Sequence, residues 1–131
     1  MVKVSAYSKE KDGNKKLSTN FRVKEFACTD GSDPIFISTE LIEILQKVRT
    51  HFGKPVTITS AYRTPTRNKA VGGTTYSQHL YGCAADIKVK GVTPKVVANY
   101  LEKILPNCGG IGLYSTFVHI DVRPTKARWK E

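Results

Sequence analysis

The chain has 131 residues, 40% of them hydrophobic and 24% charged, which suits a single globular domain with one core. Its formal net charge of +10 favours anionic partners, such as nucleic acid or an anionic cell wall. The sequence has no apolar run of the roughly 18 residues that a membrane helix requires, so we expect no membrane insertion. No apolar stretch follows Met1, so we expect no secretion signal.

The N-terminal half begins with a polar stretch. Residues 1–20 are rich in lysine and hold little to bury, so we expect an arm there and one domain over residues 21–131. Ser38 is a candidate helix N-cap, because apolar residues then recur at helical spacing over residues 41–52. The β-branched run at residues 56–59 predicts a buried strand.

The C-terminal half alternates shorter elements. We expect a short helix at residues 66–71, a strand at 84–89, a helix at 93–105, and strands at 111–114 and 117–122. The remaining residues are basic and are expected to form a tail. Helices and strands are partly segregated along the chain, which predicts an α+β fold with a mainly antiparallel sheet and helices packed on one side.

One predicted strand carries a row of polar side chains. Apolar residues alternate with His119, Asp121 and Arg123 between residues 117 and 123. Because side chains alternate between the two faces of a strand, these three share one face. Such a polar row on a rigid element is typical of a functional site.

A second candidate feature is a carboxylate in a strand otherwise suited to burial. Asp86 lies between Ala85 and Ile87, and its burial is costly unless it is paired or bound to a metal. His79 precedes it through a glycine-containing loop that can bring the imidazole back toward the strand. With His119 the two residues form a typical catalytic zinc set, with water as fourth ligand. The alternative is that His79 is a hydrogen-bonding loop residue and His119 a satisfied strand histidine.

These residues also form a known signature. The run Ser77-x-His79-x-x-Gly82-x-Ala84-x-Asp86 resembles the zinc motif of the D-alanyl-D-alanine carboxypeptidase-like metallopeptidases. That group includes D,D-carboxypeptidases, D,D-dipeptidases and phage endolysins, and the metal-binding domain of hedgehog proteins shares its fold. The resemblance extends to Ser60-Ala61-Tyr62-Arg63, to Asn68 with Val71-Gly72-Gly73, and to Phe117-Val118-His119-Ile120-Asp121.

The resemblance implies roles for individual residues. It places the zinc ligands at His79, Asp86 and His119, although other divalent metals fit the same donors. It places a substrate-binding arginine at Arg63, whose guanidinium can grip a carboxylate or carbonyl; a surface arginine is the alternative.

Two more residues belong to this candidate cleft. Ser77 matches a serine that donates to substrate or holds the loop, and a capping or turn role is the alternative. Gln78 is a further candidate for lining the cleft beside it.

The sequence departs from the family pattern near its last ligand. Many members place an acidic residue or a histidine as general base two or three residues earlier, where this chain has Phe117 and Thr116. Asp121 is the nearest alternative, as a base or by orienting the water. It could equally orient His119 or pair with Arg123, so three roles stay open.

We therefore expect a monomeric zinc peptidase acting on stem or cross-bridge peptides of bacterial peptidoglycan. It would be a D,D-carboxypeptidase or an L,D- or D,D-endopeptidase, synthesised in the cytoplasm and acting at the anionic wall, as a phage or prophage lytic protein does after release or from the virion. The alternative is a non-catalytic, zinc-stabilised cell-wall-binding module. Nucleic-acid binding is not expected, because aromatic and basic residues do not interleave as a stacking platform requires.

Overall fold

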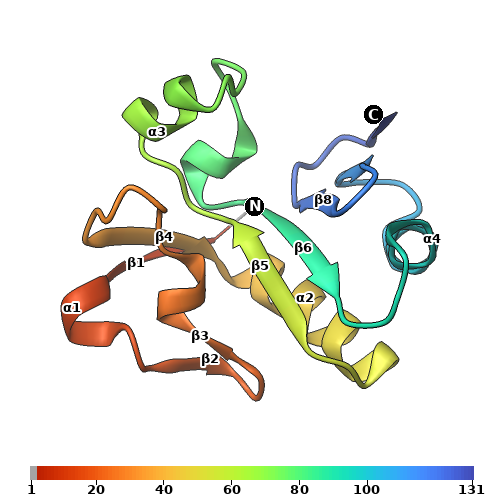
Figure 1. Ribbon diagram of the computed structural model, residues 1–131, viewed down its shortest axis with the longest axis horizontal. Helices are drawn as coiled ribbons and strands as arrows, with labels where there is room; N and C mark the ends of the chain where they lie inside the picture. The colour runs from red at the N-terminus through yellow and green to blue at the C-terminus, as the bar shows by residue number, and fades with distance from the viewer. Residues whose placement is uncertain (1–2) are drawn as a thin grey trace.

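The computed structural model describes residues 3–131, so Met1 and Val2 of the expected arm lie outside the described residues. The strands are β1 Val4–Ser8, β2 Lys16–Ser18, β3 Phe21–Arg22, β4 Pro34–Ser38, β5 Val56–Ser60, β6 Ala84–Val89, β7 Gly110–Leu113, β8 Val118–Asp121 and β9 Ala127–Lys130. The helices are α1 Lys9–Asp12, α2 Thr39–Phe52, α3 Pro65–Ala70 and α4 Pro94–Ile104, with 3-10 turns η1 Val23–Phe26 and η2 Gln78–Tyr81 (Figure 1).

A five-stranded sheet in the order β5-β6-β8-β7-β9 forms the centre of the fold. All its pairs are antiparallel except β7 with β9, which run parallel. Two small antiparallel ribbons from the N-terminal part of the chain, β1 with β4 and β2 with β3, lie to the left of β5 in Figure 1. The expected α+β class with a mainly antiparallel sheet is thus confirmed.

The two long helices pack together against the same sheet, as expected. α2 starts where the Ser38 hydroxyl accepts from the backbone N–H of Leu41, and it ends at Gly53, which adopts the left-handed conformation at φ 62°. Leu45 of α2 and Leu101 of α4 are fully buried in one core with Ile87 and other sheet residues. Burial of this face leaves the opposite face of β6 and β8 for polar side chains.

The N-terminal segment is incorporated into the fold rather than extending as an arm. β1 pairs along its whole length with β4, and the Tyr7 and Leu17 side chains pack against the core. Composition could not show this, because the ribbon is held by backbone hydrogen bonds that polar residues form as readily as apolar ones. Residues 4–8 are thus part of a strand pair with β4, and the division of the chain at residue 20 stays a prediction.

The C-terminal residues also differ from expectation, since Ala127–Lys130 form β9 instead of a tail. The strand adds to the sheet edge beside β7, and Arg128 pairs with Glu102 and donates to the Gly109 carbonyl. Its two basic residues, Arg128 and Lys130, made this segment resemble a solvated tail in the sequence. Within residues 3–131, no helix combines the length and hydrophobicity needed to cross a membrane.

Candidate metal centre and cleft

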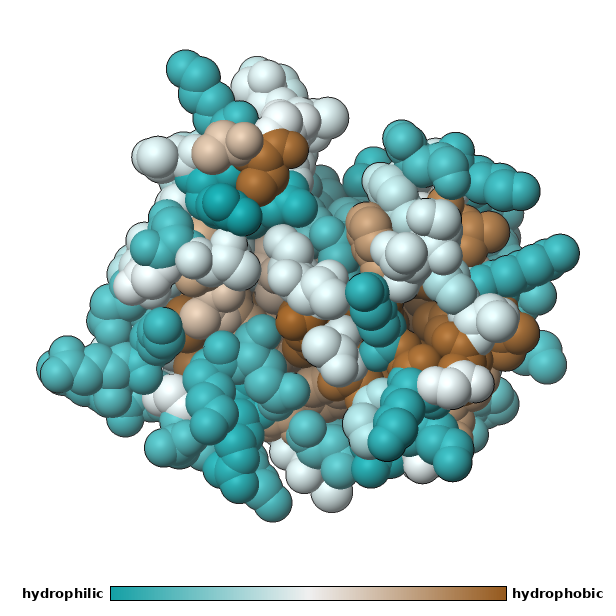
Figure 2. Space-filling view, viewed as in Figure 1, coloured by the Kyte–Doolittle hydropathy of each residue, from teal (hydrophilic) through white to brown (hydrophobic). Residues whose placement is uncertain are grey.

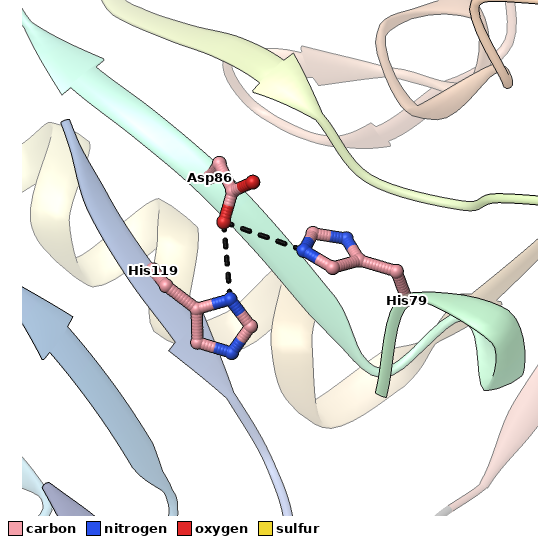
Figure 3. A group of neighbouring side chains, drawn as sticks. All are labelled: His79, Asp86 and His119. Carbon is pink, nitrogen blue, oxygen red and sulfur yellow. Dashed lines mark hydrogen bonds and ion pairs between the residues drawn. The ribbon is translucent and has the colours of Figure 1, made fainter. Parts of the chain in front are cut away.

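Three buried side chains converge on the polar face of the sheet (Figure 3). Nε2 of His79 lies 3.3 Å, and Nδ1 of His119 3.0 Å, from the same oxygen of Asp86. The three potential ligand atoms all lie within 4.8 Å of one another. Donor atoms sharing a tetrahedral zinc at about 2.1 Å stand about 3.4 Å apart, so the separations fit a common metal ion.

Strand register and a glycine turn bring these residues together. Asp86 of β6 and His119 of β8 are direct antiparallel partners, which places their side chains side by side on one face. His79 sits in η2, which ends at Gly82 with φ 70°. A Cβ at Gly82 would lie 2.2 Å from the Phe36 carbonyl oxygen, so glycine lets this turn pack against β4.

Hydrogen bonds on the outer nitrogens orient both imidazoles. Nδ1 of His79 lies 2.7 Å from the Ala61 carbonyl oxygen, which can only accept, so Nδ1 carries the proton and Nε2 is free. Nε2 of His119 donates to Oδ2 of Asp121 at 2.7 Å, which frees its Nδ1 toward Asp86. Both free nitrogens therefore face the position where a metal would bind, an arrangement common to metal-ligating histidines.

Asp121 is completely buried and fully hydrogen-bonded. Its oxygens accept from His119, from the Gly110 backbone N–H at 2.9 Å, and from the backbone N–H, Nε and Nη2 of Arg123 at 2.7–3.1 Å. Burial alone would raise the pKa of Asp121, but the bonds from His119 and Arg123 outweigh it and hold that pKa below its usual range. Of the three roles left open for Asp121, the geometry thus favours orientation of His119, combined with the Arg123 ion pair, over that of proton acceptor.

The electrostatics of the cluster favour a cation. Burial raises the pKa of Asp86, but hydrogen bonds with His119 and His79 lower it overall to about 2. Burial lowers the pKa of His119, whereas its bonds to Asp121 and Asp86 raise it above the ordinary value. Because both carboxylates favour a positive charge at His119, a proton competes with a metal ion for its Nδ1.

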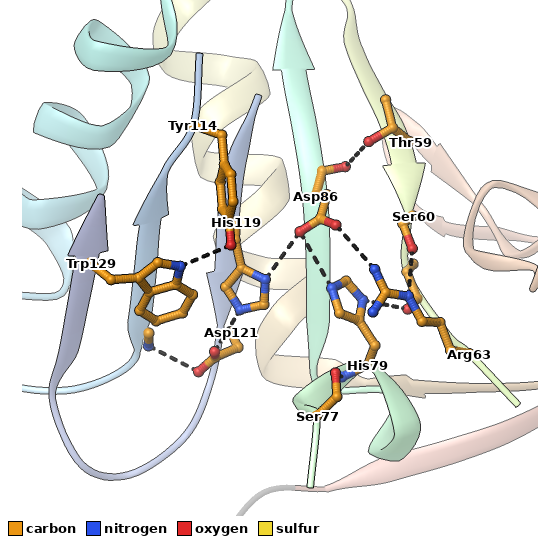
Figure 4. A network of polar contacts seen from close by, with 12 residues as sticks. Thr59, Ser60, Arg63, Ser77, His79, Asp86, Tyr114, His119, Asp121 and Trp129 are labelled. Carbon is orange, nitrogen blue, oxygen red and sulfur yellow. Dashed lines mark hydrogen bonds and ion pairs between the residues drawn. The ribbon is translucent and has the colours of Figure 1, made fainter. Parts of the chain in front are cut away.

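Arg63 lies at the edge of the same cluster (Figure 4). Its Nη2 is 3.6 Å from Asp86, its Nε donates to the Ser60 hydroxyl at 3.2 Å, and its Nη1 donates to the buried Asn68 carbonyl oxygen at 3.3 Å. The Asn68 amide also donates to the Thr74 carbonyl at 2.8 Å, which ties the loop after α3 to the arginine. The Arg63 side chain is thus held in place, and its guanidinium retains N–H groups that can donate to a substrate.

The cluster opens into a cleft of about 520 Å³. Arg63 and residues 72–74 and 76–78 line one part of it, and Tyr114, Phe117, Trp129 and Glu131 line another. Figure 2 shows a surface indentation between the part that carries α3 and the part that carries β8 and the C-terminus. A larger concavity on the outer side of α2, beside His51 and Tyr100, contains none of the three clustered residues.

Ser77 and Gln78 both line this cleft, as their proposed roles require. The Ser77 hydroxyl accepts from the His79 backbone N–H at 3.3 Å, so the structure shows the capping contact that was one of its two expected roles. Contact of either residue with a substrate stays a prediction.

The aromatic wall of the cleft was not predicted from the sequence. Trp129 belongs to the unexpected β9, and Tyr114 and Phe117 stack on each other with ring centroids 4.3 Å apart. The only sequence signal for Trp129 was its status as the single tryptophan of the chain. Its approach to the cluster depends on strand order, which the pattern of residues does not specify.

Comparison with known proteins agrees with this geometry. The family model described as Peptidase M15 matches residues 16–121, which include most of the chain and all three clustered residues. No curated protein matches the chain.

Proposed function

Because the chain belongs to the Peptidase M15 family, we propose that it is a zinc-dependent peptidase that hydrolyses peptide bonds in bacterial peptidoglycan. The observation that carries the proposal is the buried His79, Asp86 and His119 cluster, with both free imidazole nitrogens facing one carboxylate oxygen at the floor of a cleft. A divalent metal held by these residues supplies activation of water and polarisation of the scissile carbonyl.

Each remaining residue of the cleft has a separate task in this proposal. Arg63, fixed by Ser60 and Asn68, binds a carboxylate or carbonyl of the substrate peptide. Asp121 holds His119 with Nδ1 directed at the metal position. Ser77 and Gln78 contact the bound peptide from the loop wall.

Charge supports the wall as the place of action. The net charge of +10 attracts the protein to an anionic polymer, independently of the peptide that fits the cleft. We place the protein at the bacterial cell wall as a monomer, in a lytic role of phage or prophage type. Stem or cross-bridge peptides are the substrates we assign.

The second candidate function is a zinc-stabilised module that binds the cell wall without cutting it. Phe117 and Thr116 stand where many family members have a proton acceptor, and the five hydrogen bonds of Asp121 occupy the nearest alternative. The lack of a free proton acceptor argues against peptide hydrolysis, but it does not argue against metal binding.

One experiment separates the two functions. Purified protein is analysed for metal, then incubated with peptidoglycan, and released peptides and new termini are identified by mass spectrometry, with and without chelator. We expect about one zinc per chain and zinc-dependent peptide release. Zinc without release, together with co-sedimentation with the wall, would establish the binding module, whereas a folded wild type that takes up no zinc would contradict both.

Metal affinity is expected to fall as pH falls. The pKa of His119 is raised, so below that pKa its proton must be displaced before a metal can bind. Apparent zinc affinity should therefore drop by about tenfold per pH unit below this pKa and level off above it. Competition titrations with a chromophoric chelator between pH 5.5 and 8.5 would measure the effect, and an affinity independent of pH would contradict the assigned ligand.

A further inference from the structure

The ring of Trp129, the only tryptophan of the chain, packs beside that of His119 in the metal cluster, with the two ring planes tilted by 47°. The ring centroids of Trp129 and His119 are 5.0 Å apart, although the residues belong to strands separated by β7 (Figure 4). The indole is half-buried and lines the same cleft as the cluster. It therefore covers the imidazole from the side of the sheet edge.

Gly112 makes this contact across a strand possible. It is the register partner of His119 on one side and of Trp129 on the other. A Cβ at Gly112 would lie 2.5 Å from Cε2 and Nε1 of the indole. The tryptophan thus crosses β7 through the space that any other residue would fill.

Two further contacts fix the indole in this position. Its Nε1–H donates to the Tyr114 hydroxyl at 3.0 Å. The Arg123 guanidinium lies 5.5 Å from the centre of its ring and is also bonded to both oxygens of Asp121. Each of four side chains therefore contacts the next in a closed ring: Trp129, His119, Asp121 and Arg123.

We propose that Trp129 is a positioning residue of the metal centre, and that Gly112 is present to let it reach His119. The bonds to Asp86 and Asp121 lie at the two ring nitrogens of His119, and the indole packs against the ring itself. The indole prevents the imidazole from tilting and excludes water from the His119–Asp121 hydrogen bond, which is stronger in a dry environment. This inference rests on the metal site of the proposed function.

Three variants test the positioning role through zinc affinity. Trp129→Ala removes the cover, Gly112→Ala displaces the indole without removing it, and Trp129→Phe retains an apolar ring. We expect the first two to weaken zinc binding by about tenfold or more, and the phenylalanine variant to stay close to wild type. Lys130→Ala, on the same strand with an exposed side chain, is the matched control.

A purely structural role would lower the melting temperature of the metal-free protein and leave the metal centre unaltered in whatever protein folds. The absorption spectrum of bound Co²⁺ is therefore compared among the folded variants, and should change for Gly112→Ala but not for Lys130→Ala. The tryptophan also reports on itself, since Co²⁺ bound beside His119 should remove most of its fluorescence. His119→Ala should abolish that loss.

The outcomes distinguish this inference from the function on which it rests. A wild type without zinc would contradict the proposed function. A wild type that contains zinc but whose fluorescence is insensitive to Co²⁺ would contradict the positioning role of Trp129 and leave the proposed function standing. This result would count even if the alanine variants fail to fold. Folded Gly112→Ala and Trp129→Ala proteins with wild-type zinc affinity and Co²⁺ spectra would overturn it as well.

Discussion

Replacing Asp86 with alanine is expected to abolish metal binding and peptide hydrolysis together. Asp86 supplies the oxygen that both histidines face, and its pKa of about 2 keeps it ionised throughout the physiological range. Without it, two neutral imidazoles remain for a divalent cation, below the three protein ligands usual in catalytic zinc sites. Loss of metal chemistry worth several kcal/mol corresponds to at least about a thousandfold lower turnover.

Elemental analysis and peptide release from peptidoglycan would measure both effects in the same preparation. Glu43→Ala is the control, because it removes an exposed carboxylate on α2 remote from the cluster. Asp86→Asn is an informative intermediate, since the amide retains a neutral oxygen ligand but loses the charge. An Asp86→Ala protein that keeps stoichiometric zinc and wild-type turnover would show that the active metal lies elsewhere.

Two members of the cluster, Asp86 and His119, could be singled out from the sequence because their polar side chains stand among apolar strand residues, whereas the full set with His79 followed from the resemblance to the metallopeptidase signature. Asp86 is a carboxylate between Ala85 and Ile87, which are both suited to burial, and His119 lies between Val118 and Ile120 in an alternating strand. Such conflicts occur at functional sites, where a bound group offsets the cost of burial. Asp86 and His119 lie side by side because β6 and β8 are adjacent antiparallel strands in which these two residues are register partners.

Features that depend on register or on backbone bonding were not predictable in this way. The pairing of β1 with β4 uses backbone groups that every sequence possesses, so the polar, lysine-rich composition of residues 1–20 taken together suggested an arm. Trp129 reaches His119 only because β9 joins the sheet beside β7 in a register that puts Gly112 between them. Neither strand order nor register is encoded in a short pattern of basic and aromatic residues.

Replacing Asp121 with asparagine is expected to weaken zinc binding by about ten- to a hundredfold and to lower turnover with it. Asp121 accepts five hydrogen bonds, from His119, Gly110 and Arg123, and has no exposed surface. An amide must direct its NH₂ group toward at least one of these donors. With the NH₂ group in the place of Oδ2, His119 and Nη2 of Arg123 lose their acceptor, and the imidazole is no longer held with Nδ1 toward the metal position. With the NH₂ group in the place of Oδ1, three other donors face it, and the side chain must shift away from the position that holds His119.

The same variant decides between the roles that sequence left open for Asp121. If it were the general base, Asp121→Asn would lose turnover while zinc affinity stayed at the wild-type value. If it positions His119, zinc affinity falls, and raising the zinc concentration restores much of the lost activity because all three ligands remain. Zinc titrations followed by turnover assays at low and saturating zinc, with the surface variant Asp30→Asn as control, would distinguish these results. The buried, fully bonded carboxylate leads us to expect recovery at saturating zinc.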